Sequence, residues 1–163
     1  MKENLTLRMA TEDDYAPLHR YSNILGVFQK MSPDKLVITP ERMKEMLKDK
    51  TLESIIAELD GEIAGVGLFY IMPSGFSGKE VIFLHIFYVE EHLQHEGIGK
   101  AIMVYLSKLA LERNIERLEW LCLDWNEPAK QFYYDIGAQE IDIVKTFRLS
   151  PEGMQKLVDE NPL

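Results

Sequence analysis

Several features that mark secreted, membrane-spanning and metal-binding chains are missing from this sequence. Its 163 residues include one cysteine, Cys122, which excludes an internal disulfide and a zinc site built from several cysteines. No run approaches the roughly 18 consecutive apolar residues of a membrane-spanning helix, and the first residues show no apolar signal-peptide core. The four histidines have no convincing spacing to acidic residues. We therefore expect a cytoplasmic protein without a membrane segment or a metal.

Dense basic clusters are missing as well. The formal net charge is −9, and no group of Lys and Arg residues is dense enough to line a groove for phosphates. This argues against a nucleic-acid partner. An acidic chain suits a small cationic partner, although acidity that serves only solubility explains the charge equally well.

Length and composition indicate one folded domain. The chain is 46% hydrophobic and 28% charged, unlike a disordered chain, and it is long enough for one sizeable core but not for two. No repeat or linker interrupts it, so we expect a single domain over residues 1–163. Strand-like and helix-like patterns alternate, which predicts an α/β or α+β fold.

Six segments have the pattern of strands. Asp60-Gly61 separates two of them and favours a two-residue hairpin, because both residues accept positive φ. The segment Val81–Val89 is apolar on both alternating faces, which predicts a central strand covered on both sides, with His85 as its main polar exception. The predicted strands are Leu5–Met9, Ser54–Glu58, Glu62–Met72, Val81–Val89, Arg117–Leu123 and Ala138–Leu149.

Four helices are predicted between these strands. Thr11 precedes three acidic residues as an N-cap does, and Thr39-Pro40 places a proline at the first helical position. From Gly97 onward apolar residues recur at the spacing of one helical face, and a shorter helix is predicted over residues 127–136. Residues 22–38 contain glycine and proline, so we expect an irregular, mobile loop there.

The segment Gln94–Lys100 joins the buried strand to the long helix. At such a junction the first helical N–H groups lack intrahelical acceptors and the helix dipole is positive, which favours phosphate. A side chain at Gly97 or Gly99 would hold the anion off the amides, whereas Gln94 and Lys100 add contacts. Spacing alone leaves a plain strand-to-helix turn open. The glycine patterns of dinucleotide-binding folds and nucleotide triphosphatases are absent.

A family resemblance begins at this loop. Gln94-x-x-Gly97-x-Gly99 after a hydrophobic strand resembles the Gln/Arg-x-x-Gly-x-Gly/Ala signature of the GNAT acetyltransferase superfamily, which binds acetyl-coenzyme A (acetyl-CoA). The strand Phe83–Val89 and the run Asp124–Ala138, with its Trp-Asn-Glu-Pro and Phe-Tyr sequences, resemble the diamine (spermidine/spermine) acetyltransferase branch. The opening Leu7–Thr11 is also usual for the superfamily. Residues 20–50, where substrate selectivity varies, match no such pattern.

The resemblance implies a GNAT fold, with a mixed, mostly antiparallel sheet of about six to seven strands and about four flanking helices. It also implies that the central strand splays from its neighbour, so that the main chain of Phe87 and Val89 pairs with pantetheine and supplies an oxyanion donor. Trp125 is expected to pack instead of stacking on a base. The implied acetyl-CoA-binding residues are Phe87, Tyr88, Val89, Gln94, His95, Glu96, Gly97, Ile98, Gly99, Lys100, Asn126 and Tyr133.

Two residues are candidates for proton transfer. The resemblance assigns Tyr133 as the acid for the leaving thiolate, a role that a phenol of pKa about 10 suits, although periodicity alone favours a core tyrosine. Tyr134 is the weaker candidate. The diamine branch carries an acidic pair where this chain has His85 and Ile86, so His85 is either a base acting through a water or a hydrogen-bonded core histidine. Loss of the acid at Ile86 removes a polyamine anchor, so polyamine specificity does not follow.

The leading interpretation is an N-acetyltransferase that moves an acetyl group from acetyl-CoA to a primary amine. A small cationic acceptor, either a polyamine or an amino-acid-like compound, is expected. The alternatives are a protein lysine or N-terminal acetyltransferase and a non-catalytic acyl-CoA sensor. Retention of Tyr133 with Asn126 argues against the sensor. Homodimers are common among proteins that resemble this one, but the sequence does not fix the oligomeric state.

Overall fold

The computed structural model describes residues 4–161 and divides into two compact units, the first ending at Asn126 and the second beginning at Glu127. In the first unit the described strands are β1 (Leu5–Met9), β2 (Glu53–Leu59), β3 (Glu62–Pro73), β4 (Glu80–Val89) and β5 (Arg117–Trp120), and the helices are α1 (Tyr15–Phe28), α2 (Pro40–Lys48) and α3 (Ile98–Glu112). The second unit holds α4 (Glu127–Asp135) and α5 (Pro151–Glu160). The single domain over residues 1–163 stays a prediction.

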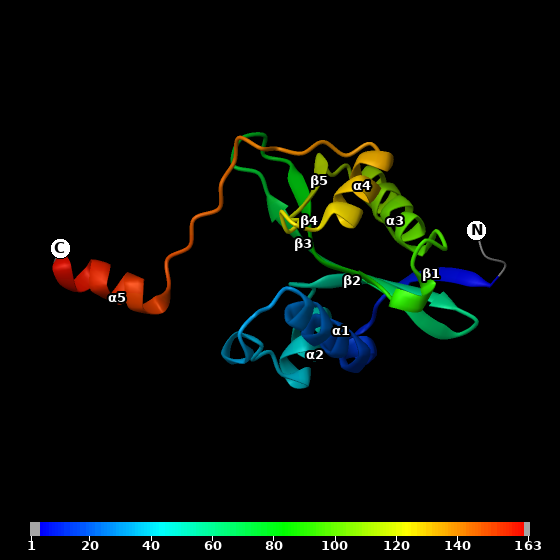
Figure 1. Cartoon of the computed structure of the whole chain (residues 1–163), viewed down its shortest axis with the longest axis horizontal. Helices are drawn as coiled ribbons and strands as arrows, with labels where there is room; N and C mark the ends of the chain where they lie inside the picture. Colours follow the sequence, from blue (N-terminus) through cyan, green and yellow to red (C-terminus); the bar gives the residue numbers. More distant parts are fainter. Residues whose placement is uncertain (1–3, 162–163) are drawn as a thin grey trace. The chain divides into compact units, whose positions relative to one another are not determined.

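The strands form one sheet in the order β1-β2-β3-β4-β5. All neighbours are antiparallel except β4 and β5, which are parallel. The helices α1 and α2 cover one face and α3 covers the other (Figure 1). The predicted α/β class with a mixed, mostly antiparallel sheet is confirmed. The predicted count is wrong, because the described residues form five strands and five α-helices.

The closing strand predicted over residues 138–149 is not formed in the described chain, where this segment has no regular structure. The side chains of Ile143 and Phe147 are 89% and 92% exposed, so their apolar pattern does not reflect burial on one face of a sheet. A strand also needs the backbone of a neighbour, which the pattern of one segment does not reveal. β5 likewise ends at Trp120, three residues before the predicted end at Leu123.

The loop predicted for residues 22–38 begins only after Phe28, because α1 continues through Gly26. Gly26 is buried, and a Cβ added there would lie 2.2 Å from Cδ2 of Leu36 in the following loop. This glycine therefore permits close packing within a helix and does not end it.

The predicted hairpin and one predicted helix start are confirmed. Asp60 and Gly61 have φ values of 54° and 85°, as a two-residue turn with two positive φ angles requires. The Thr39 hydroxyl accepts a 3.1 Å hydrogen bond from the Arg42 N–H at the start of α2. A short 3₁₀ helix, η1 (Glu12–Asp14), precedes α1.

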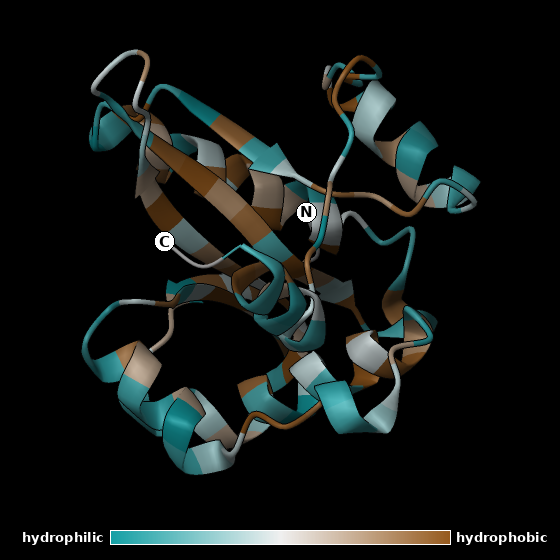
Figure 2. Ribbon diagram, turned by 90° about the vertical axis from the view of Figure 1, so that its left-hand side faces the viewer, coloured by the Kyte–Doolittle hydropathy of each residue, from teal (hydrophilic) through white to brown (hydrophobic). Residues whose placement is uncertain are grey.

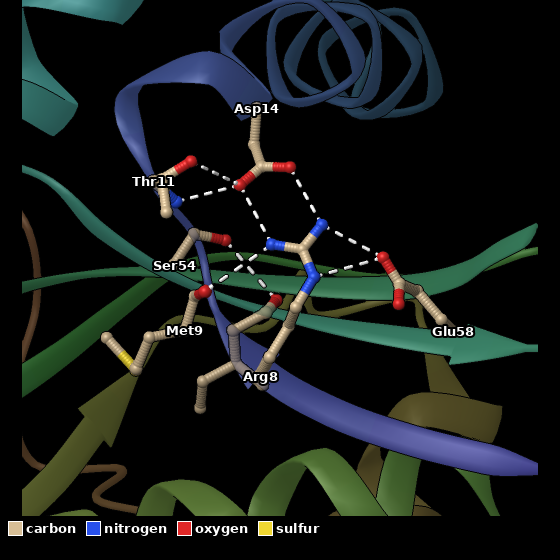
Figure 3. Close-up of polar contacts among 7 residues, drawn as sticks. Arg8, Met9, Thr11, Asp14, Ser54 and Glu58 are labelled. Atoms are coloured by element: carbon tan, nitrogen blue, oxygen red, sulfur yellow. Dashed lines mark hydrogen bonds and ion pairs between the residues drawn. The ribbon is translucent and has the colours of Figure 1, made fainter. Parts of the chain in front are cut away.

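Arg8 joins β1 to β2 and to the start of the helical layer. Its guanidinium donates two 2.8 Å hydrogen bonds to Asp14 and bonds of 2.9 and 3.1 Å to Glu58 (Figure 3). Asp14 also accepts a 2.7 Å bond from the Thr11 N–H, and the guanidinium lowers the pKa of the Asp14 carboxyl. Charge-assisted bonds of this kind fix the entry to α1 on the sheet.

The helical layer packs on the sheet through buried apolar side chains. Leu18 and Tyr21 of α1 and Met43 of α2 share one core cluster with Ile56 and Val66 of the sheet. Figure 2 shows the hydrophobic colour concentrated on the central strands and hydrophilic residues along the helices. This packing fixes α1 and α2 relative to β4, the strand that carries most of the candidate site.

Candidate active site

β4 pairs with β5 only along the first part of β4. The parallel pairing joins only Val81–Leu84 to Arg117–Trp120. Within the described residues no other strand lies on that side of β4, so the edge of His85–Val89 is left open toward β5. The predicted splay of the central strand is therefore present.

The main chain of Val89 faces this open edge. The Glu90 N–H donates a 3.0 Å hydrogen bond to the Ala64 carbonyl of β3, and the Tyr88 carbonyl lies against Gly65 of the same strand. Because neighbouring residues of a strand direct their backbone groups to opposite sides, Phe87 and Val89 direct theirs to the open edge. Consistently, the Gln94 side chain donates a 3.4 Å bond to the Val89 carbonyl.

Tyr88, also predicted to bind acetyl-CoA, has its backbone turned toward β3. Its ring packs against Tyr21 of α1 with 5.4 Å between ring centroids. Tyr88 therefore belongs to the packing that supports the open edge.

His85 is the extra residue of a β-bulge. Leu68 pairs with Ile86 while the next residue, Phe69, pairs with Leu84, so His85 is skipped in the register. Bulges re-aim side chains and are common beside active sites. His85 is among the exposed residues of β4, although neighbouring side chains desolvate its ring, which lies 5.4 Å from that of Tyr70. Its role as a base stays a prediction. Partial burial lowers the pKa of His85, so the imidazole is neutral at pH 7.

The glycine loop has the geometry of an anion site. Gly97, the N-cap of α3, has a φ of 82°, and His95 has a φ of 65°. Apart from Gly97 and its two neighbours in the sequence, no atom of the described chain lies within 4 Å of a Cβ added at Gly97. The first helical bond runs from the Ala101 N–H to the Gly97 carbonyl, so the N–H groups of residues 98–100 have no acceptor within the helix.

The side chains of the loop divide between packing and solvent. Ile98 is 1% exposed and anchors α3 in the core, so only its main chain is available to a ligand. Gln94, His95, Glu96 and Lys100 are exposed, and no acidic residue lies in the first turn of α3. Lys100 and the positive end of the helix dipole therefore favour an anion at this turn, whereas the Glu96 carboxylate just before the N-cap opposes one. Gly99, the second glycine of the motif, lies inside that turn.

A pocket of about 200 Å³ lies between α1, the loop after it, α2 and the strands β3 and β4. Most of its wall is apolar. Of the polar residues that line the pocket, only His85 was predicted from the sequence, because the wall is assembled from elements that are far apart along the chain. The polar lining residues are Ser22, Asn23, Lys35, Tyr70 and His85.

The remaining predicted residues follow β5 along the chain. Asn126 ends the first unit, and its N–H donates a 2.9 Å bond to the Leu123 carbonyl. Tyr133 lies on α4 in the second unit, with its ring 5.5 Å from that of Phe132. Tyr134 donates to the Glu140 carboxylate, which raises the pKa of Tyr134. The catalytic role of Tyr133 and the coenzyme contact of Asn126 stay predictions.

The first unit exposes Trp125, which lies 5.6 Å from the ring of Phe28 and 5.8 Å from the ammonium of Lys30. Trp125 thus contacts the end of α1, and the choice between packing and stacking on a base stays a prediction. Over the residues described, no helix is both long and apolar enough to cross a membrane. The same residues contain no group of three or more His, Cys, Asp or Glu side chains able to hold a metal ion.

Comparison with known proteins places this geometry in a family. The model of the acetyltransferase (GNAT) family matches residues 19–138. A thialysine N-epsilon-acetyltransferase of Caenorhabditis elegans is 28% identical, over 97% of this chain and 99% of that protein. An L-ornithine N5-acetyltransferase of Arabidopsis thaliana is 29% identical over 60% of this chain and 43% of its own length.

Solved structures show the same fold. An aminoglycoside acetyltransferase from an uncultured soil metagenomic sample, crystallised with trehalose, superposes with a TM-score of 0.78. The match covers 91% of this chain and 99% of that chain at 18% sequence identity. At this identity the likeness concerns the fold alone.

Proposed function

The chain belongs to the GNAT acetyltransferase family and is an N-acetyltransferase, and from that premise we propose that it acetylates the terminal amine of a small aliphatic acceptor held between α1, α2 and β4. One observation carries the proposal. His85 and Ile86 line the pocket and are also the first residues of β4 beyond its pairing with β5. An amine in the pocket therefore lies beside the strand edge where this family holds the acetyl thioester.

The residues around the open edge fit an acyl-CoA. The backbone of Val89 faces the edge, where pantetheine would add as an extended strand. The amides of residues 98–100 would receive the pyrophosphate, and the open space at Gly97 admits it. Gln94, which already contacts the Val89 carbonyl, ties the two parts of this surface together.

The transfer needs a neutral amine, an oxyanion donor and a proton for the thiolate. The amine nitrogen attacks the acetyl carbon, the C–S bond breaks, and the sulfur leaves as a thiolate that takes a proton from Tyr133. The excess proton on nitrogen passes through a water to neutral His85, whose lowered pKa keeps it able to accept. The Val89 N–H is the candidate oxyanion donor.

The relatives support a small acceptor. Several relatives that match the chain are named for thialysine and L-ornithine, both small amino acids with a side-chain amine, and others are named for the small amines tyramine and spermidine/spermine. A pocket of about 200 Å³ suits a molecule of that size better than a folded protein substrate.

Coenzyme-dependent thiol release on a panel of amines tests the proposal. We expect turnover with small aliphatic amines and none with lysine-containing peptides. Acetylation of peptides alone would favour the protein acetyltransferase, and coenzyme binding without turnover on any amine would favour a sensor.

We further propose a cytoplasmic homodimer. The second unit exposes several large apolar side chains, among them Ile143 and Phe147, and surfaces of this kind are commonly covered by a second subunit. Sedimentation equilibrium tests this part, with a mass of twice 18.9 kDa expected and a monomer mass contradicting it.

A further inference from the structure

The pocket between α1, α2 and β4 contains no carboxylate. None of its lining residues is Asp or Glu, although the chain as a whole carries a net charge of −9. With His85 neutral, Lys35 is the one lining residue with a full charge. A pocket that binds a polyamine would need acidic side chains to pair with its ammonium groups, because an unpaired buried charge is costly.

Lys35 is available to a ligand. It ends the 3₁₀ turn η2 (Pro33–Lys35) in the loop between α1 and α2, and its side chain is exposed. In the part of the chain that the structure describes, no carboxylate lies within ion-pair distance of its ammonium. The loop that carries Lys35 is tied to α1 by His19, whose Nε2 lies 2.9 Å from the Ile38 carbonyl oxygen.

Besides the Lys35 ammonium, the pocket contains two polar residues of α1 that can accept hydrogen bonds from a ligand. The Ser22 hydroxyl donates a 3.0 Å bond to the Leu18 carbonyl, and the Asn23 amide nitrogen donates a 3.1 Å bond to the His19 carbonyl. With their donors engaged inside the helix, both side chains offer oxygen acceptors to the pocket. Oxygen acceptors suit an ammonium group, and Lys35 suits a carboxylate.

We propose that Lys35 is a specificity-determining residue that binds the α-carboxylate of the acceptor, while Ser22 and Asn23 accept hydrogen bonds from its α-ammonium. The acceptor class is then an α-amino acid with a terminal side-chain amine, and simple diamines and polyamines are poor substrates. The inference rests on the proposed acetyltransferase function of the same site. The apolar wall, including Met43 and Leu68, carries the methylene chain toward His85.

Matched acceptors that differ only in the carboxylate test the proposal. Thialysine is compared with bis(2-aminoethyl) sulfide, and ornithine with 1,4-diaminobutane, by kcat/KM for thiol release. The wild-type enzyme should prefer each amino acid over its decarboxylated partner by about 10- to 100-fold, the range expected for one charge-assisted contact. Lys35→Ala should abolish the preference, and Lys35→Glu should reverse it.

Lys48→Ala is the matched control, because Lys48 is an exposed lysine at the end of α2 outside the pocket lining. It should retain the wild-type preference. Equal losses on both members of each pair in Lys35→Ala would show a merely structural role and overturn the proposal, as would equal use of both members by the wild-type enzyme. Coenzyme binding with no acetylation of any of the four amines would instead overturn the proposed function itself.

Discussion

The Tyr21 hydroxyl donates a 2.7 Å hydrogen bond to the Glu90 carboxylate, which ties the middle of α1 to the residue that follows β4. Tyr21 is 2% exposed, and burial together with the Glu90 carboxylate raises the pKa of its phenol. Arg20 contacts the same carboxylate at 3.2 Å. One helix of the acceptor pocket is thus fastened to the segment that leads into the glycine loop.

Replacing Tyr21 with Phe should destabilise the protein by roughly 1.5–3 kcal/mol, because a hydrogen bond to a charged group is lost and a half-buried carboxylate keeps only Arg20. Urea unfolding measures the change. Tyr15→Phe is the control. The ring of Tyr15 contacts Lys44, and its hydroxyl donates no hydrogen bond to another described residue, so its removal breaks no such bond. Equal losses in the two variants would deny the Tyr21–Glu90 bond this role.

The pH dependence of turnover reports on His85. Its folded pKa is below the ordinary value of about 6.5, so the neutral base persists as the pH falls through 6.5. The acidic limb of kcat should therefore lie below pH 6.5. His85→Gln should lower kcat by roughly 10²-fold and remove that limb. An unchanged limb in the variant would assign it to another group.

The same shift affects stability. The unfolded chain binds a proton at His85 before the native chain does, so the contribution of neutral His85 is present above pH 6.5 and is lost as the pH falls. In His85→Gln the free energy of unfolding should depend less steeply on pH below 6.5. A chemical-denaturation series at several pH values measures both slopes.

Tyr133→Phe should lower kcat by roughly 10² to 10⁴ and leave coenzyme affinity nearly unchanged, if Tyr133 protonates the thiolate as predicted. Tyr134→Phe is the matched control on the same helix, because the Tyr134 hydroxyl is bonded to Glu140. Single-turnover kinetics compares the two. Wild-type turnover in Tyr133→Phe would remove this residue from the mechanism.

Features set by adjacent residues were predictable from the sequence. Asp60-Gly61 specifies its turn through its own φ angles, and Thr39-Pro40 specifies a helix start in the same local way. The glycine loop around Gly97 was predicted from a local motif together with a family resemblance. In the structure Gly97 has a left-handed backbone conformation, which favours glycine.

Features that depend on distant partners were not predictable. The bulge at His85 exists only in the register between β3 and β4, so a period-two pattern along β4 alone could not reveal it. The acceptor pocket joins α1, a loop, α2 and two strands, and no spacing within residues 20–50 indicates it. Gly26 was expected to interrupt a helix, because its close contact with Leu36, ten residues further along the chain, is not visible in the local sequence.

The anion site at the start of α3 is most directly tested by calorimetric titration of coenzyme A into two alanine variants. Gly97 and Gly61 have nearly equal positive φ angles, 82° and 85°, and a Cβ at either has open space, so Gly97→Ala and Gly61→Ala carry the same backbone strain of about 1–2 kcal/mol. Only the Gly97 methyl group stands where the pyrophosphate would approach the amides. We predict affinity at least roughly tenfold weaker for Gly97→Ala and wild-type affinity for Gly61→Ala. Wild-type affinity in Gly97→Ala, or no binding to the unaltered protein, would contradict an anion site at this helix start.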